Sequence, residues 1–219
     1  MAEDLFARHG LDVGQCAATV AEGLTGADDG ELFLEHRVTE ALVFDDGKMK
    51  SATYDVSDGF GLRAVAGETV AVAHASDVSH GALKRAAATV AMAGRGHTGN
   101  VDVAPMGTNR ALYRDLDPVA EPSFSEKAEL LAKIDAYARD KDPRVRQVSA
   151  SLAAERQIVN ILRADGHRIA DLRPLVRFSV SVIVGENGRQ ETGTTGMGGR
   201  EPYQRFIAEG SWRGAVDEA

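Results

Sequence analysis

A chain of 219 residues can form one large domain or two small ones, each with its own hydrophobic core. Hydrophobic residues make up 43% and charged residues 26%, which is ordinary for a soluble globular protein. The net charge of −8 argues against a nucleic-acid-binding protein, because such proteins present a basic face. Cys16 is the only cysteine, which excludes an internal disulfide, and no apolar stretch has the length of a signal peptide or membrane span. These features predict a cytoplasmic protein.

The segment 31–74 is predicted to form short antiparallel strands. Asp-Asp-Gly at 45–47 favours a tight hairpin, because Asp-Gly readily takes the positive φ angles that such a turn requires. Two further turns are expected at 58–59 and 66–68. The connections are too short for parallel crossovers, so the strands should form an antiparallel meander.

An amphipathic helix should follow, with Ser79 capping its start and Gly94 its end. Its apolar stripe is mostly alanine, which lets the helix pack closely. The stripe consists of Leu83, Ala86, Ala87, Val90 and Ala91.

Residues 95–122 are rich in Gly, Asn, Asp and Pro, and are predicted to form a connector.

After the connector, Ser123 and Glu126 form a capping-box pattern at the start of a helix that runs to about Asp140. Two strand segments flanking a bend are expected from Val145, followed by hairpin turns at 165–166 and 186–188. Residues 175–184 alternate between valine or phenylalanine and polar side chains, which predicts a strand with one buried face. The predicted fold class is α+β in two units, each an antiparallel sheet with a packed helix.

Motifs with catalytic or cofactor-binding chemistry are not supported. Residues 94–99 spell G-x-G-x-x-G but leave a helix, so they do not form a dinucleotide loop. The glycine-rich residues 193–200 lack a P-loop ending and are interpreted as a flexible or tightly turned segment. The histidines form no zincin pair, and His36 and His74 are interpreted as hydrogen-bonded residues at a sheet margin. No catalytic residue and no metal ligand is therefore predicted.

Several segments together resemble the TldD branch of the TldD/PmbA (TldE) metalloprotease family. They include ELFLEHRVTEAL, the hairpins from Asp45 and the run ADLRPLVRFSV at 170–180, followed by the loop that ends Gly-Gly-Arg. The resemblance covers about residues 24–203 and implies a division into an N-terminal domain at 1–94, the connector 95–122, and an incomplete central domain at 123–219. The family's C-terminal metal-binding domain would then be absent.

The resemblance implies a cytoplasmic zinc metalloprotease that degrades or processes unfolded peptides with a PmbA/TldE-like partner or by self-association. In the family, zinc is held by a histidine-glutamate motif in the C-terminal domain, so this chain would be a non-catalytic portion. It also suggests that one sheet face lines an enclosed chamber or contacts a partner. The candidate residues are Arg173, Arg177, Gly198, Gly199 and Arg200. The alternative is a non-enzymatic module that binds peptides or a partner as it stands.

At the carboxyl end, the sequence predicts a short helix capped by Gly210-Ser211. Trp212, Val216 and Ala219 would form the beginning of its apolar stripe. Without a stop signal, this helix is expected to continue in a longer protein. Residues 211–219 should then fray, with Trp212 on an exposed apolar patch.

Overall fold

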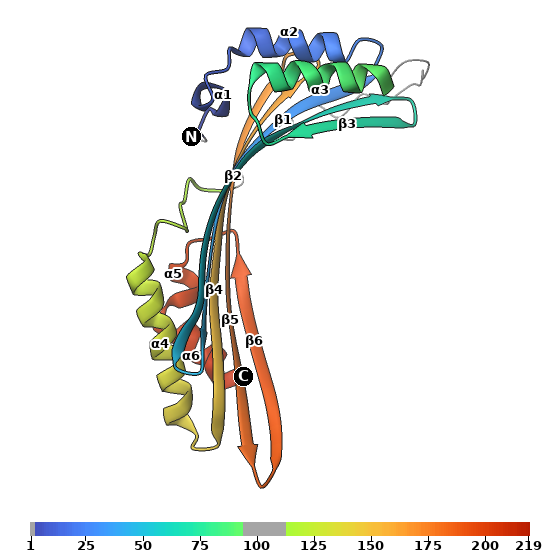
Figure 1. Ribbon diagram of the computed structural model, residues 1–219. Coiled ribbons are helices and arrows are strands. Elements are labelled where there is room, and N and C mark those ends of the chain that lie inside the picture. Colours follow the sequence, from blue (N-terminus) through green and yellow to red (C-terminus); the bar gives the residue numbers. More distant parts are fainter. Residues whose placement is uncertain (1–2, 94–112) are drawn as a thin grey trace. The chain divides into compact units, whose positions relative to one another are not determined.

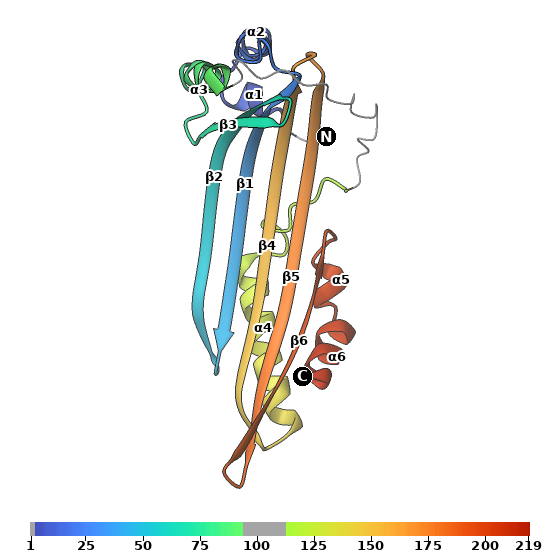
Figure 2. The same cartoon turned by 90° about the vertical axis from the view of Figure 1, so that its right-hand side faces the viewer.

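A computed structural model describes residues 3–93 and 113–219. Its described part contains a six-stranded sheet in the order β3-β2-β1-β4-β5-β6 (Figures 1 and 2), with antiparallel pairing of β2 with β3 and of β5 with β6. Together with the helices, this sheet confirms the α+β class. The strands are β1 (Asp29–Asp45), β2 (Lys48–Ala66), β3 (Thr69–Ala75), β4 (Val145–Arg163), β5 (Arg168–Glu186) and β6 (Arg189–Gly199). The helices are α1 (Leu5–Arg8), α2 (Val13–Gly23), α3 (His80–Ala93), α4 (Phe124–Lys141), α5 (Gln204–Ile207) and α6 (Glu209–Glu218).

The chain divides into two compact units that interleave along the sequence. Unit 1 comprises residues 1–37, 57–114 and 157–172, and unit 2 comprises 38–56, 115–156 and 173–219. Four strands contribute residues to both units, because β1, β2, β4 and β5 are 17 to 19 residues long. Such strands are about three times the usual length. Each unit therefore combines segments that are far apart in the sequence.

Unit 1 packs α2 and α3 against its part of the sheet (Figure 1). The predicted stripe of α3 is buried at Leu83 and Val90, and Ser79 accepts a hydrogen bond from the Ala82 N–H at 3.2 Å, which confirms the cap. A Cβ at Gly23 would lie 2.8 Å from the Cβ of Ala87, so α2 and α3 approach too closely for a larger side chain. Gly94, the 94–99 pattern and residues 95–112 of the connector lie outside the described residues.

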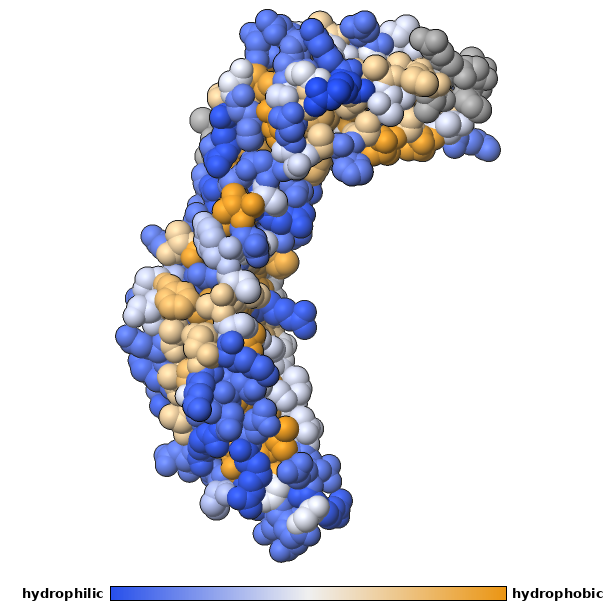
Figure 3. All heavy atoms as spheres, viewed as in Figure 1, coloured by the Kyte–Doolittle hydropathy of each residue, from blue (hydrophilic) through white to orange (hydrophobic). Residues whose placement is uncertain are grey.

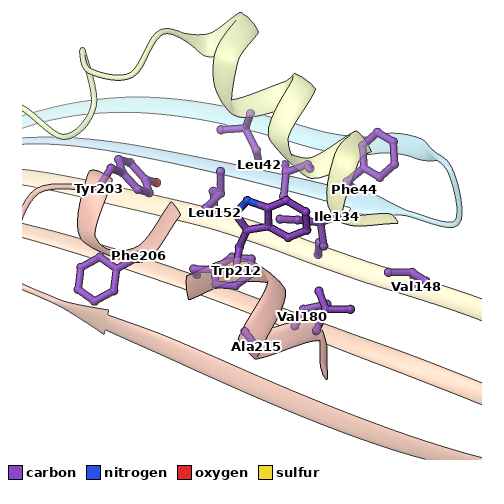
Figure 4. Close-up of a cluster of buried hydrophobic side chains, with 14 of the residues drawn as sticks. Leu42, Phe44, Ile134, Val148, Leu152, Val180, Tyr203, Phe206, Trp212 and Ala215 are labelled. Atoms are coloured by element: carbon purple, nitrogen blue, oxygen red, sulfur yellow. The ribbon is translucent and has the colours of Figure 1, made fainter. Parts of the chain in front are cut away.

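Unit 2 packs α4, α5 and α6 over its part of the sheet, and Figure 4 shows the side chains that they bury. The capping box of α4 is confirmed: Ser123 Oγ accepts from the Glu126 N–H, and Glu126 accepts from the Ser123 N–H at 2.8 Å. The core combines residues from six elements, β1, β4, β5, α4, α5 and α6. Its members include Leu42, Phe44, Leu131, Ile134, Val148, Leu152, Val176, Phe178, Tyr203, Phe206 and Trp212.

The hairpin turns predicted from Asp-Gly and Asn-Gly are confirmed. Asp46 and Gly47 have φ angles of 50° and 77°, and Asn187 and Gly188 have φ angles of 51° and 80°. Gly166 also has a positive φ, of 82°. These positions are left-handed, which Gly, Asn and Asp tolerate better than other residues.

Three interpretations of strand boundaries are wrong. Residues 58–59 lie inside β2, where the Asp58 carboxylate has side-chain partners and a Cβ at Gly59 would lie 3.1 Å from the Ala75 carbonyl oxygen. Residues 193–199 form part of β6, so their glycines mark close backbone approach within a sheet. The two segments expected around a bend form the single continuous strand β4.

The interpretation of the carboxyl end also needs correction. The N-cap position of α6 is Ala208, and Ser211 lies inside the helix, where its hydroxyl donates to the Arg205 carbonyl oxygen at 3.0 Å. The predicted stripe is present, but Trp212 is only 6% exposed and packs edge-on against Tyr137. Burial against α4 and the sheet supplies the packing that the sequence alone does not reveal.

No helix within residues 3–93 and 113–219 combines the length and the hydropathy needed to cross a bilayer.

Candidate functional site

The candidate residues on β5 and β6 meet in the strand register. Arg177 lies opposite Gly198, and Val176 lies opposite Gly199. Val176 is fully buried and Arg177 is exposed, so the predicted alternation of β5 is correct at this point. A Cβ at Gly198 would lie 2.5 Å from the carbonyl oxygen of Val176, so the close approach of β6 requires glycine there.

The other two candidate arginines lie further from this pair. Arg173 precedes Arg177 by four residues on β5, which places it on the same face but about 13 Å away along the strand. Arg200 follows directly after β6, and both Arg173 and Arg200 are half-buried. The structure therefore places Gly198 opposite Arg177 and Gly199 on the buried face against Phe206, and it leaves Arg173 as a separate position on the face of Arg177.

Small hydroxyl side chains lie further along β5 and its neighbours on the same face as Arg177. The Ser151 and Ser179 hydroxyls are 2.8 Å apart across β4 and β5, and the Thr194 hydroxyl donates to the Ser181 oxygen at 3.0 Å across β5 and β6. Among the residues that the structure describes, no carboxylate lies within ion-pair distance of Arg177. The face thus offers one exposed guanidinium, a fixed donor group for carboxylates, on a surface of small side chains.

A buried polar cluster in unit 2 was missed by the sequence interpretation. The Lys127 ammonium is completely buried and lies 2.5 Å from a Glu40 carboxylate oxygen. It also donates to the carbonyl oxygens of Val119 and Pro118, at 2.7 and 3.3 Å. These contacts join β1, α4 and the segment before α4. A sequence signal did exist, because Lys127 shares the apolar stripe of α4 with Leu131.

Tyr203 completes this cluster. Its ring centroid is 5.3 Å from Lys127 Nζ, and its hydroxyl is buried without a hydrogen-bond partner among the described residues. Burial, and secondly the charge of Glu40, raise the pKa of Tyr203 far above its ordinary value. A cavity of about 50 Å³ adjoins it, which is large enough for water but not for a peptide. The cavity is lined by Leu116, Asp117, Pro118, Glu121, Pro202, Tyr203 and Gln204.

A second polar cluster, in unit 1, surrounds Asp58. One carboxylate oxygen of Asp58 lies 2.9 Å from His36 Nδ1 and 3.2 Å from His9 Nε2, and Arg8 Nε is 3.9 Å away. Burial raises the pKa of Asp58, but the hydrogen bond from His36 and the nearby charges outweigh it, so the pKa lies below its ordinary value. The interpretation of His36 as a hydrogen-bonded residue is confirmed. His74 differs, because it is exposed beside Val72 on β3.

Neither cluster has the composition of a zinc site. Catalytic zinc in proteins needs about three ligands with open geometry. In residues 3–93 and 113–219, no group of three or more His, Cys, Asp or Glu side chains could hold a metal ion. The one carboxylate that two histidines approach, Asp58, is already occupied by hydrogen bonds, and the sole cysteine is buried in an apolar core.

Comparison with known families identifies two adjacent domains. Residues 30–93 match a family described as PmbA/TldA metallopeptidase domain 1, and residues 117–219 match the PmbA/TldA metallopeptidase central domain. The first matched segment ends before the predicted connector, and the second begins within it, at residue 117. Together they include most of the chain.

Among curated proteins, the chain is similar to two described as metalloprotease TldD homologs. It is 34% identical to one from Buchnera aphidicola subsp. Schizaphis graminum over 83% of the chain and 38% of that protein. It is 37% identical to one from Haemophilus influenzae over 79% of the chain and 36% of that protein. The chain therefore spans less than two fifths of the length of these relatives.

A solved structure of TldE from Thermococcus kodakarensis has a similar fold. The superposition covers 93% of this chain and 46% of the TldE chain, with a TM-score of 0.70 and 14% sequence identity. At this identity, the similarity concerns the fold.

Proposed function

Since the chain belongs to the PmbA/TldD metallopeptidase family, we propose that it is a non-catalytic portion of a zinc metalloprotease acting on unfolded peptides. The observation that carries this proposal is the combination of two facts. The chain is more than 30% identical to TldD homologs over most of its length, yet its described residues offer no group of metal ligands. The metal and the hydrolytic residues would belong to a part of the protein outside this sequence.

The role proposed for this chain is to support the fold and to bind a peptide or a partner. Both units have a hydrophobic core of their own, so each can hold a sheet face rigidly for another domain or a peptide. The face around Arg177 suits an extended peptide or a partner surface, because small side chains allow close approach and the guanidinium can pair with a carboxylate. Gly198 keeps this face flat beside Arg177, whereas Gly199 faces Phe206 in the core, and Arg173 lies further along the same face.

The proposed partner is a PmbA/TldE-like subunit, and the proposed compartment is the cytoplasm. The family match and the TldE-like fold support an assembly of related subunits. Self-association is the second possibility for the same surface. No nucleic acid is expected to bind, given the net charge of −8.

A different function is a peptide-binding or partner-binding module that is complete as it stands. The extensive cores of both units favour it, because each unit buries its helices without help from another chain. The reading frame beyond the codon for Ala219 distinguishes the two functions. A histidine-glutamate zinc motif downstream supports the metalloprotease, and an immediate stop codon supports the module.

The role of the Arg177 face can be tested by binding. We expect a labelled, unfolded acidic peptide to bind the chain, and Arg177→Ala to weaken binding about tenfold, the effect of losing one charge-assisted contact. Arg189→Ala is the matched control, because Arg189 is exposed at the tip of the β5–β6 hairpin and pairs with Glu191. Equal binding by both variants and the unaltered chain would exclude this face as the peptide site.

A further inference from the structure

Strand β3 in unit 1 has an outer edge that no other strand of residues 3–93 and 113–219 pairs with, and the proposed function does not use it. It pairs with β2 on one side, from Phe60 opposite Ala75 to Ala66 opposite Thr69, and it ends the strand order on the other side. None of the other described strands pairs with that outer edge. Alternate N–H and C=O groups of an edge strand point away from the sheet, where they can bond to another strand.

The composition of β3 lacks the usual protection of an edge. Its seven residues, Thr-Val-Ala-Val-Ala-His-Ala, include no lysine, no carboxylate and no proline. Natural sheets commonly place charges, prolines or bulges at exposed edges because these prevent pairing with another chain. An unprotected edge of this length in a chain of net charge −8 therefore indicates a surface that pairs.

The outward side chains of β3 form an apolar row. Val70 and Val72 are 56% and 59% exposed, and Figure 3 shows hydrophobic residues along the margin that β3 occupies in Figure 1. Arg63 lies opposite Val72 on β2, but its guanidinium bonds to Glu31 on β1 at 3.2 Å. The valines are thus left open to solvent beside the free edge.

We propose that two copies of this chain pair through β3, antiparallel, with the two-fold axis at Val72. In this register, Val72 lies opposite Val72 of the second copy, Val70 lies opposite His74, and Ala71 lies opposite Ala73. The last two pairs each occur twice, once on either side of the axis, as in any two-fold interface, and none of the pairs brings two lysines or two carboxylates together.

The buried face of β3 and the charges at the ends of the strand support pairing with a second copy of the chain. Ala71, Ala73 and Ala75 already pack against the core of unit 1, so pairing extends an apolar layer from one copy to the next. Glu68 comes to lie opposite Ser76, so no two like charges face each other. The contact is small, and we expect weak, concentration-dependent dimers.

Cysteine cross-linking tests the register. Opposite residues of an antiparallel pair have Cα atoms about 4.5–5.5 Å apart, within reach of a disulfide. Val72→Cys should therefore give a covalent dimer under mild oxidation. Val70→Cys is the matched control, because its two copies would lie about 13 Å apart along the strands. Cys16 is fully buried and should not interfere. Equal cross-linking of both variants would overturn the proposed register.

Sedimentation velocity over a concentration series tests the interface itself. Val72→Lys should weaken dimerisation at least about tenfold, because it places two ammonium groups opposite each other. Met92→Lys should leave dimerisation unchanged, since it adds the same charge at a 73% exposed position of α3 and not on the edge strand. A chain that stays monomeric throughout, or a Val72→Lys variant that dimerises like the parent, would overturn the proposal.

Discussion

The two units hold a carboxylate of their sheet in different ways. In unit 1, Asp58 is 28% exposed and is shared by His36, His9 and the more distant Arg8. In unit 2, Glu40 is 10% exposed and faces the completely buried Lys127. One carboxylate thus depends on partners at a half-open margin, and the other on a single cation sealed in the interior.

This difference determines how each unit should respond to change. The pKa of Asp58 lies below its ordinary value, so its contacts contribute less to stability once acid protonates the carboxylate. A buried charge whose partner is removed has no access to water, but a half-exposed one can be solvated. Unit 2 should therefore be sensitive to substitution of the ion pair, and unit 1 to acid.

The largest effect is expected for Lys127→Met. It leaves the Glu40 carboxylate buried without its cation and should cost about 3–5 kcal/mol of unfolding free energy. Urea unfolding followed by Trp212 fluorescence measures it, because Trp212 is the only tryptophan and lies in the core of unit 2. Lys133→Met is the matched control, since Lys133 is exposed on the same helix.

A double variant separates the charge from the packing. Replacing Glu40 by leucine together with Lys127→Met removes both charges and should restore most of the lost stability, because an apolar pair can replace a buried ion pair. If the single variant is as stable as the parent, the Lys127–Glu40 contact does not hold the unit together.

An intermediate effect is expected for Asp58→Asn in unit 1. Loss of the charge-assisted contacts should cost about 1.5–3 kcal/mol at neutral pH. Amide hydrogen exchange of unit 1 measures it, since the unit has no tryptophan. Glu22→Gln removes an exposed charge from α2 and serves as the control.

The acid dependence has a definite sign. The pKa of Asp58 is lower in the folded chain than its ordinary value, so the folded state binds a proton less readily than the unfolded state. Its contribution is complete above the ordinary pKa and is lost as the pH falls through the lowered pKa. The parent should lose protection below about pH 4, and Asp58→Asn should lose less over the same range. Identical acid profiles would contradict the role of Asp58.

The features predictable from the sequence are those fixed by neighbouring residues. The left-handed turns at Asp46-Gly47 and Asn187-Gly188 and the capping box of Ser123 and Glu126 follow from local backbone chemistry. The alternation of β5 follows because adjacent side chains of a strand point to opposite faces.

The missed features depend on residues far apart in the sequence. Lys127 and Glu40 are separated by 87 positions, and only the fold brings them together. The glycines at 193–199 are equally compatible with a loop in the sequence. Only the pairing with β5 shows that these residues form a strand. Trp212 was placed in solvent because its packing partner, Tyr137, belongs to another helix. The polar position of Arg177 on β5 is visible in the local sequence, whereas the position of Gly198 opposite it depends on the strand register.

The smallest effect, and opposite in sign, is expected for Tyr203→Phe beside the ion pair of unit 2. The hydroxyl is buried without a hydrogen-bond partner among the described residues, so its removal relieves a desolvation penalty and leaves the ring over Lys127 in place. The variant should be equal to the parent or more stable by up to about 1 kcal/mol. Urea unfolding with Trp212 fluorescence measures this change alongside Lys127→Met. A loss above about 1 kcal/mol would mean that the hydroxyl is hydrogen-bonded, and the adjoining cavity of about 50 Å³ has room for the bridging water. In that case the interior of unit 2 is hydrated, and the contrast with the half-open cluster around Asp58 is smaller than burial alone indicates.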